Sequence, residues 1–300
     1  MAEDTSSVPV KKKGDVVEGY RVLSEIGRGA ASVIYLVQDP KSKQIVALKH
    51  VEKQTDKDQR FLDQTETEYK VARQLDHPGI RKIERLIRKG SFLAVKELYL
   101  VMEFVDGVSL DRHPPQTFEE ACTIFEQAAA AMAHMHGRGF VHADMKPNNI
   151  VVSEGGVVKI IDLGQSCSSG TVKPRIQGTP DYIAPEQVHR RAITPKTDVY
   201  NLGATMYWVL TRQHIPTALA KGDSLVGSLD DNLVAKPKPA IELNPRIHPK
   251  LNDLIMQCVE IDPDKRPETM KEVQDRLNLV RGILNAATAM AAGAIDDEED

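Results

Sequence analysis

The chain is organised around residues 141–152, which read VHADMKPNNIVV. Two runs rich in β-branched residues flank a short polar segment, so the pattern predicts a strand, a loop and a second strand. The loop contains an acid at Asp144, a cation at Lys146 and an amide at Asn149. A carboxylate there can orient an attacking hydroxyl group and accept its proton. An ammonium group can offset charge on a transferring phosphoryl group, and an amide oxygen is a ligand that suits Mg²⁺.

A second signal follows at residues 159–164, which read KIIDLG. An apolar run closed by Asp162 delivers another oxygen ligand for a hard cation at the end of a strand. The two segments, H-x-D-x-K-x-x-N at 142–149 and D-L-G at 162–164, together resemble the catalytic loop and the metal-binding motif of eukaryotic-type (Hanks-type) serine/threonine protein kinases.

Composition places the chain among soluble globular proteins, with 41% apolar and 27% charged residues in a length of 300. The acidic run at 296–300 accounts for the net charge of −4, so we expect no nucleic-acid partner. Cys122, Cys167 and Cys258 lie far apart without metal-ligand spacing, which is typical of a reducing compartment. No apolar run is long enough for a membrane span or a signal peptide, so we expect a cytoplasmic chain with no membrane partner.

Residues 20–37 predict a strand, a glycine-rich turn and a strand. The kinase form of this segment is G-x-G-x-x-G-x-V; here Ser32 stands at the third glycine and Ile34 at the valine. A simple hairpin turn is the alternative origin of the pattern. The resemblance implies that ATP contacts Ile26, Gly27, Arg28, Gly29, Ala30, Ala31, Ser32, Ile34, Ala47, Lys49, Met102, Glu103, Val105 and Val151.

One cation interrupts the apolar strand at 44–51, in the sequence V-A-L-K that ends at Lys49. It resembles the kinase strand whose lysine contacts the α- and β-phosphates, although a solvated edge lysine is the alternative. The helical pattern at 58–75 offers Glu68 as the partner of Lys49, by family spacing, with Glu66 as the competitor if the register differs.

Residues 178–186, GTPDYIAPE, resemble the substrate-docking segment of serine/threonine kinases. The resemblance implies that Thr179 bridges Asp144 and Lys146. It also implies a buried ion pair between Glu186 and Arg266, and an Asp198 side chain that hydrogen-bonds the backbone of the catalytic loop.

The chain departs from the family at Ala143, where kinases commonly have arginine. In the family that arginine binds a phosphate on the activation loop through a charge-assisted pair. Alanine has no charge to offer, so we expect activity without this phosphorylation, whatever modification Ser168, Ser169 or Thr171 receives.

We therefore predict an α+β, two-lobed protein kinase fold. A disordered leader at 1–18 precedes the kinase domain at 20–284, and an Ala-rich, acidic tail follows at 285–300. The domain divides into an N-lobe at 20–105, an antiparallel sheet plus one helix, and a mainly helical C-lobe at 106–284.

The resemblance implies that Mg-ATP binds in the cleft and that its γ-phosphoryl group passes to Ser or Thr hydroxyls of protein substrates. Asp144, Lys146, Lys49, Glu68 and Thr179 would be the catalytic residues, and Asn149 and Asp162 would hold Mg²⁺. A nucleotide-binding pseudokinase that acts as a scaffold, and a small-molecule phosphotransferase, are the alternatives. The sequence does not identify the substrate, the activating signal or the oligomeric state.

Overall fold

The computed structural model describes residues 10–91, 94–217 and 235–296, which form two compact units. The first unit runs to Asp106, without residues 77–79, and includes Asp162–Gly164. The second unit contains residues 77–79, 107–161 and the chain from Gln165 onward. The division after residue 106 is close to the predicted lobe boundary, but the D-L-G segment belongs to the first unit.

The first unit is a six-stranded antiparallel sheet with one α-helix, as predicted. Side chains alternate along the central strands, so one face forms a core around Val33, Tyr35 and Val37. On the other face, Leu62 of the helix packs against Val51 and Leu98. The spatial order is β1 (Val16–Val17), β2 (Tyr20–Gly29), β3 (Ser32–Gln38), β4 (Ile45–Glu52), β6 (Ala94–Glu103) and β5 (Ile83–Ser91), with α1 at Gln59–Ala72 after the 3-10 turn Asp56–Asp58.

The N-terminal segment corrects one prediction. Strand β1 lies within the predicted disordered leader and pairs with β2, with Val17 opposite Tyr20. The backbone N–H of Lys11 also donates to the hydroxyl group of Tyr35 at 3.1 Å. The leader is therefore structured from residue 10, and residues 1–9 lie outside the described part of the chain.

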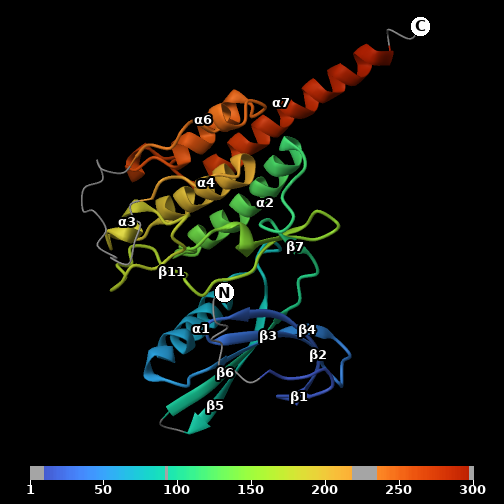
Figure 1. The fold of residues 1–300 in the computed structure, drawn as a ribbon, viewed down its shortest axis with the longest axis vertical. Helices are drawn as coiled ribbons and strands as arrows, with labels where there is room; N and C mark the ends of the chain where they lie inside the picture. The colour runs from blue at the N-terminus through green and yellow to red at the C-terminus, as the bar shows by residue number, and fades with distance from the viewer. Residues whose placement is uncertain (1–9, 92–93, 218–234, 297–300) are drawn as a thin grey trace, which may run out of the picture. The chain divides into compact units, whose positions relative to one another are not determined.

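The second unit is mainly helical, and Figure 1 shows α2, α4 and α7 lying side by side (green to red). Its longer helices are α2 (Phe118–Gly137), α4 (Pro195–Thr211), α6 (Pro249–Cys258) and α7 (Met270–Asp296). Shorter elements are α3 (Pro185–Val188), α5 (Ala240–Leu243) and the 3-10 turns at Pro147–Asn149 and Pro263–Lys265. Two small antiparallel sheets join β7 (Val108–Ser109), β9 (Ile150–Val152) and β10 (Val158–Ile160), and β8 (Phe140–Val141) with β11 (Cys167–Ser168).

The sequence predicts an amphipathic helix at 118–136 with Thr117 as its N-cap, and helix α2 begins there. The Thr117 hydroxyl accepts a hydrogen bond from the Glu120 N–H at 3.1 Å, which satisfies a donor that the helix itself leaves unpaired. Its buried face includes Ala121, Phe125 and Met132, which fixes the helix in the core.

Helix α7 extends beyond the predicted domain end at residue 284. Residues 285–296 continue the helix, because alanine has the highest helix propensity of all residues. In Figure 1 these last turns project away from the neighbouring helices. Residues 297–300 of the predicted tail lie outside the described residues. So do residues 218–234, which belong to a segment, 213–245, whose prolines and lack of periodicity predict a surface loop. Within the described residues, no helix is long and apolar enough to cross a membrane.

Candidate active site

The first unit contains the predicted ion pair between Lys49 on β4 and Glu68 on α1. The Lys49 Nζ lies 2.7 Å from Oε2 of Glu68, whose side chain is fully buried on the sheet-facing side of the helix. Burial alone would lower the pKa of Lys49, but the carboxylates of Glu68 and Asp162 outweigh it and raise that pKa above its ordinary value. The ammonium group is therefore held charged and fixed in direction.

Glu66, the competing partner, faces away from Lys49. Its carboxylate binds Arg88 at 2.9 Å and Lys70 at 3.4 Å. The second partner of Glu68 is instead Arg81, with Nη2 3.4 Å from Oε1. No spacing rule in the sequence points to Arg81, because it approaches the helix from a separate segment of the chain.

Most of the residues predicted to contact ATP belong to the first unit, on the β2–β3 hairpin, on β4 and at the end of β6. In the hairpin, Gly29 lies opposite Ser32, and a Cβ added at Gly29 would lie 2.8 Å from the Ser32 hydroxyl oxygen. Glycine therefore allows the two strands to approach closely there. Ile26 on the same hairpin is 45% exposed.

Ala47 and Met102 are cross-strand neighbours on β4 and β6, and both are buried. Their burial makes them part of the core of the first unit. The N–H of Glu103 donates to the Lys82 carbonyl at 2.9 Å, so any contact of the Glu103 backbone with adenine falls to its carbonyl group. Val151, also predicted to contact ATP, is on β9 and belongs to the second unit.

The second unit brings Asp144, Lys146 and Thr179 into a closed cluster. The Lys146 Nζ lies 2.9 Å from Oδ2 of Asp144 and 2.8 Å from the Thr179 hydroxyl oxygen. Oδ1 of Asp144 accepts from both the N–H and the hydroxyl group of Thr179, each at 2.8 Å. The predicted bridge by Thr179 is confirmed as a set of contacts.

Asp198 on α4 binds the backbone of the catalytic loop. Its buried carboxylate accepts hydrogen bonds from the backbone N–H groups of His142 and Ala143, each at 2.8 Å, as predicted. Burial raises its pKa, but the His136 ring 2.8 Å away and the backbone donors outweigh burial and leave that pKa below its ordinary value. Ala143 has a left-handed backbone (φ 62°), a conformation unfavourable for alanine that these hydrogen bonds help to hold.

Gln187 joins the catalytic loop to the docking segment. No motif in the sequence predicts this role. Its Nε2 donates to the carbonyls of Ala143 at 2.8 Å and Gln177 at 3.2 Å. Its Oε1 accepts from the Ala184 N–H at 3.0 Å and from the Asn201 amide at 3.1 Å. The side chain is buried, and its bonds to Ala143, Ala184 and Asn201 are shielded from water, whereas the bond to Gln177 is partly buried.

The histidines near α2 have ordinary partners. Although His134, His136 and His142 are close in sequence, His136 binds Asp198, and the His134 ring lies 5.3 Å from that of His77.

The three cysteines have free thiols, with Cys122 and Cys258 buried in helices. Burial also raises the pKa of the Cys167 thiol, so it is not an activated thiolate.

Two oxygen-bearing side chains fit the predicted magnesium ligands. The Asn149 amide nitrogen donates to the Asp144 carbonyl at 2.9 Å, which leaves the amide oxygen as the atom that can be offered to a cation. Oδ1 of Asp162 accepts from the Gly164 N–H at 2.9 Å, which fixes the carboxylate in direction. Neutral and anionic oxygen donors of this kind suit Mg²⁺.

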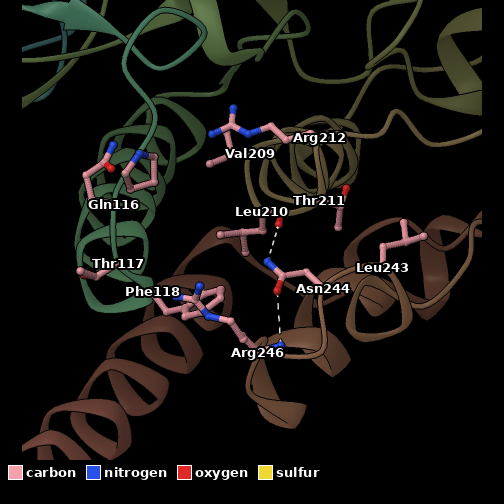
Figure 2. Close-up of a pocket in the computed structure, with 11 residues that line it drawn as sticks. Gln116, Thr117, Phe118, Val209, Leu210, Thr211, Arg212, Leu243, Asn244 and Arg246 are labelled. Carbon is pink, nitrogen blue, oxygen red and sulfur yellow. Dashed lines mark hydrogen bonds between the residues drawn. The ribbon is translucent and has the colours of Figure 1, made fainter.

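A pocket of about 340 Å³ elsewhere in the second unit contains none of these residues. Figure 2 shows it between the start of α2, the end of α4 and the segment after α5. The guanidinium group of Arg246 lies over the Phe118 ring at 5.7 Å, and the Asn244 amide donates to the Leu210 carbonyl at 2.9 Å. These contacts hold the ends of three helices together.

Comparison with known proteins identifies the family. The model of the protein kinase domain matches residues 20–277. Serine/threonine-protein kinase PrkC of Bacillus subtilis is 31% identical over 299 residues, which cover 93% of this chain and 45% of that protein. The probable serine/threonine-protein kinase PknB of Lactococcus lactis is 30% identical, covering 85% of this chain and 40% of that protein. The chain thus spans less than half the length of these relatives. Its motifs occur in the family order, and the chain belongs to the protein kinase family.

Proposed function

We propose that the chain transfers the γ-phosphoryl group of Mg-ATP to Ser and Thr hydroxyls of proteins. The observation that carries the proposal is the closed cluster of Asp144, Lys146 and Thr179. The names of the relatives, serine/threonine-protein kinases, support the same activity.

The bonding of Asp144 defines its proposed role. Oδ1 already accepts two hydrogen bonds from Thr179, whereas Oδ2 accepts one from Lys146. Since each carboxylate oxygen has two lone pairs, Oδ2 retains one for the hydroxyl group of a substrate. Asp144 would orient this hydroxyl group and accept its proton, while Lys146 would stabilise the charge on the transferring group.

The first unit would hold the nucleotide. Lys49, fixed by Glu68, would bind the α- and β-phosphates, and the β2–β3 hairpin would cover them. Asn149 and Asp162 would hold Mg²⁺, which neutralises phosphate charge when it is bound.

Activity would not depend on phosphorylation of the activation loop. Ala143 offers no cation to a phosphate and is buried in an apolar cluster with Val141 and Ile193, against which Cys167 packs. Ala143 itself would offer a phosphate no charged partner in exchange for the hydration lost on burial.

The test is phosphate transfer to a generic basic protein, with Asp144→Asn as the inactive variant and Asp253→Asn, an exposed residue on α6, as the control. We expect labelled Ser or Thr with the control variant and a loss of at least about a thousandfold with Asp144→Asn. Nucleotide binding without transfer would support the pseudokinase instead. Transfer only to small hydroxyl compounds would support the small-molecule phosphotransferase.

A further inference from the structure

The activation loop, residues 165–177 between the D-L-G segment and the docking segment, is fixed over its first half by backbone hydrogen bonds. Strand β11 pairs with β8, with Cys167 opposite Val141. Next, the Gly170 N–H donates to the Ile193 carbonyl at 2.7 Å, and the Ile193 N–H donates to the Thr171 carbonyl at 2.8 Å. The loop is therefore attached to the second unit as far as residue 171.

The second half of the loop leads to Thr179, and its anchors are side chains. The Gln187 amide binds the Gln177 carbonyl near its end. Near its beginning, the Lys173 ammonium group reaches back eight residues and donates to the Gln165 carbonyl. This bond links the start of the loop to the segment that carries Thr179 to Asp144.

The surroundings of Lys173 carry charges of both signs. Its side chain is partly buried, and burial lowers its pKa below the ordinary value. Cys167 and the carboxylates of Asp144 and Asp198 oppose part of this shift, whereas Arg175 adds to it. Ala143 of the catalytic loop, in the cluster against which Cys167 packs, has no charge. The cation that interacts with Cys167 is instead Lys173 of the activation loop itself.

We propose that Lys173 is a positioning residue. Its bond to the Gln165 carbonyl holds the activation loop so that Thr179 keeps its hydrogen bonds to Asp144. The inference rests on the proposed kinase activity. It assigns to a lysine within the loop the ordering that a phosphate and an arginine supply in the family. A side chain of the loop needs no prior modification to make this bond, so the loop is ordered without phosphorylation.

The test compares Lys173→Met, which removes the charge but keeps much of the side-chain length, with Lys173→Arg, which keeps the charge. Arg175→Met is the matched control, because Arg175 is an exposed cation in the same loop. The measurements are kcat, the KM for ATP and for a peptide, and hydrogen–deuterium exchange of residues 172–178.

We expect Lys173→Met to lower kcat about tenfold, with the KM for ATP within about twofold of the wild type, because a disordered loop misplaces Thr179 without touching the nucleotide. Amide exchange in residues 172–178 should become at least about tenfold faster. Lys173→Arg should recover most of the activity, and Arg175→Met should change neither measurement.

The proposal is overturned if Lys173→Met exchanges as slowly as the wild type, or if Arg175→Met loses as much activity as Lys173→Met. It is also overturned if Lys173→Arg recovers nothing while its thermal midpoint is unchanged. If the wild type transfers no phosphate, the proposed function fails. The exchange rates of the variants still decide whether Lys173 holds the loop.

Discussion

The guanidinium group of Arg266 forms a two-pronged ion pair with the carboxylate of Glu186, with N–O distances of 2.8 and 3.0 Å. Both side chains are buried. The remaining donors of Arg266 bind three backbone carbonyls, those of Lys196, Glu260 and Ile261. The pair thus fastens the docking segment to the turn before α7.

Removing the two partners of this pair should have unequal effects. Arg266→Met leaves a buried, unpaired carboxylate and three carbonyls without donors, so we expect a loss of about 3–5 kcal/mol in the free energy of unfolding. Glu186→Gln keeps an acceptor for Arg266, so a loss of about 2 kcal/mol is expected. Chemical denaturation measures both.

Asp275→Asn is the control for this pair, because it breaks an exposed ion pair with Lys271 on α7. Such pairs contribute little to stability, so the unfolding curve should match that of the wild type. An equal loss for Arg266→Met and Glu186→Gln would contradict the argument from the backbone carbonyls.

The lowered pKa of Asp198 predicts that acid reduces the free energy of unfolding. Its pKa is lower in the folded chain than its ordinary value of 3.8, so its ionised form stabilises the fold above that pH. The contribution is lost as pH falls from 3.8 toward the lowered value. Asp198→Asn lacks it at every pH, because the amide NH₂ faces backbone donors of His142 or Ala143.

The difference in unfolding free energy between wild type and Asp198→Asn should therefore be constant above about pH 5 and shrink below it. Denaturation curves at a series of pH values measure this difference. Asp253→Asn, at an exposed position, should have the same unfolding free energy as the wild type at every pH. If the difference between wild type and Asp198→Asn stays constant through the acid range, the pKa of Asp198 is not lowered in the folded chain.

Glu68 and Glu66 allow a matched test on a single helix. Glu68→Gln removes the negative charge that holds Lys49 and also its contact with Arg81, so we expect kcat/KM to fall by about 10- to 100-fold through misplacement of the ammonium group. Glu66→Gln removes only contacts with Arg88 and Lys70, and should leave activity within about twofold of the wild type.

Steady-state kinetics with varied ATP measure both variants, and thermal midpoints exclude unfolding as the cause. Full activity in Glu68→Gln would remove Glu68 from the catalytic set. A comparable loss in both variants would indicate a general effect of charge on α1.

The sequence predicted contacts that depend on motif spacing. The cluster of Asp144, Lys146 and Thr179 is present as expected, and so is the ion pair of Lys49 and Glu68. Each of these residues lies in a segment with a recognisable pattern, and the family spacing fixes which residues can meet.

Contacts without such spacing were missed. Arg81, Gln187 and Lys173 reach their partners through folds of the backbone that no periodicity encodes. Strand β1 was missed because it has only two residues, Val16 and Val17, too few to show an alternating pattern. The extension of α7 was missed because the acidic end of the sequence made an alanine-rich helix look like a tail.

The burial of Ala143 leads to the last prediction, on phosphatase treatment. The wild type should retain most of its activity after complete removal of phosphate, because position 143 has no cation that could bind a phosphate on the loop. Mass spectrometry establishes that the phosphate is gone, and transfer to a basic protein measures the activity. A variant with Ser168→Ala, Ser169→Ala and Thr171→Val removes three hydroxyl groups of the loop and leaves the buried Ser166, and it should behave in the same way. A loss of more than about 90%, equivalent to about 1.4 kcal/mol in the barrier, in both the treated enzyme and this variant would show that a loop phosphate is needed after all.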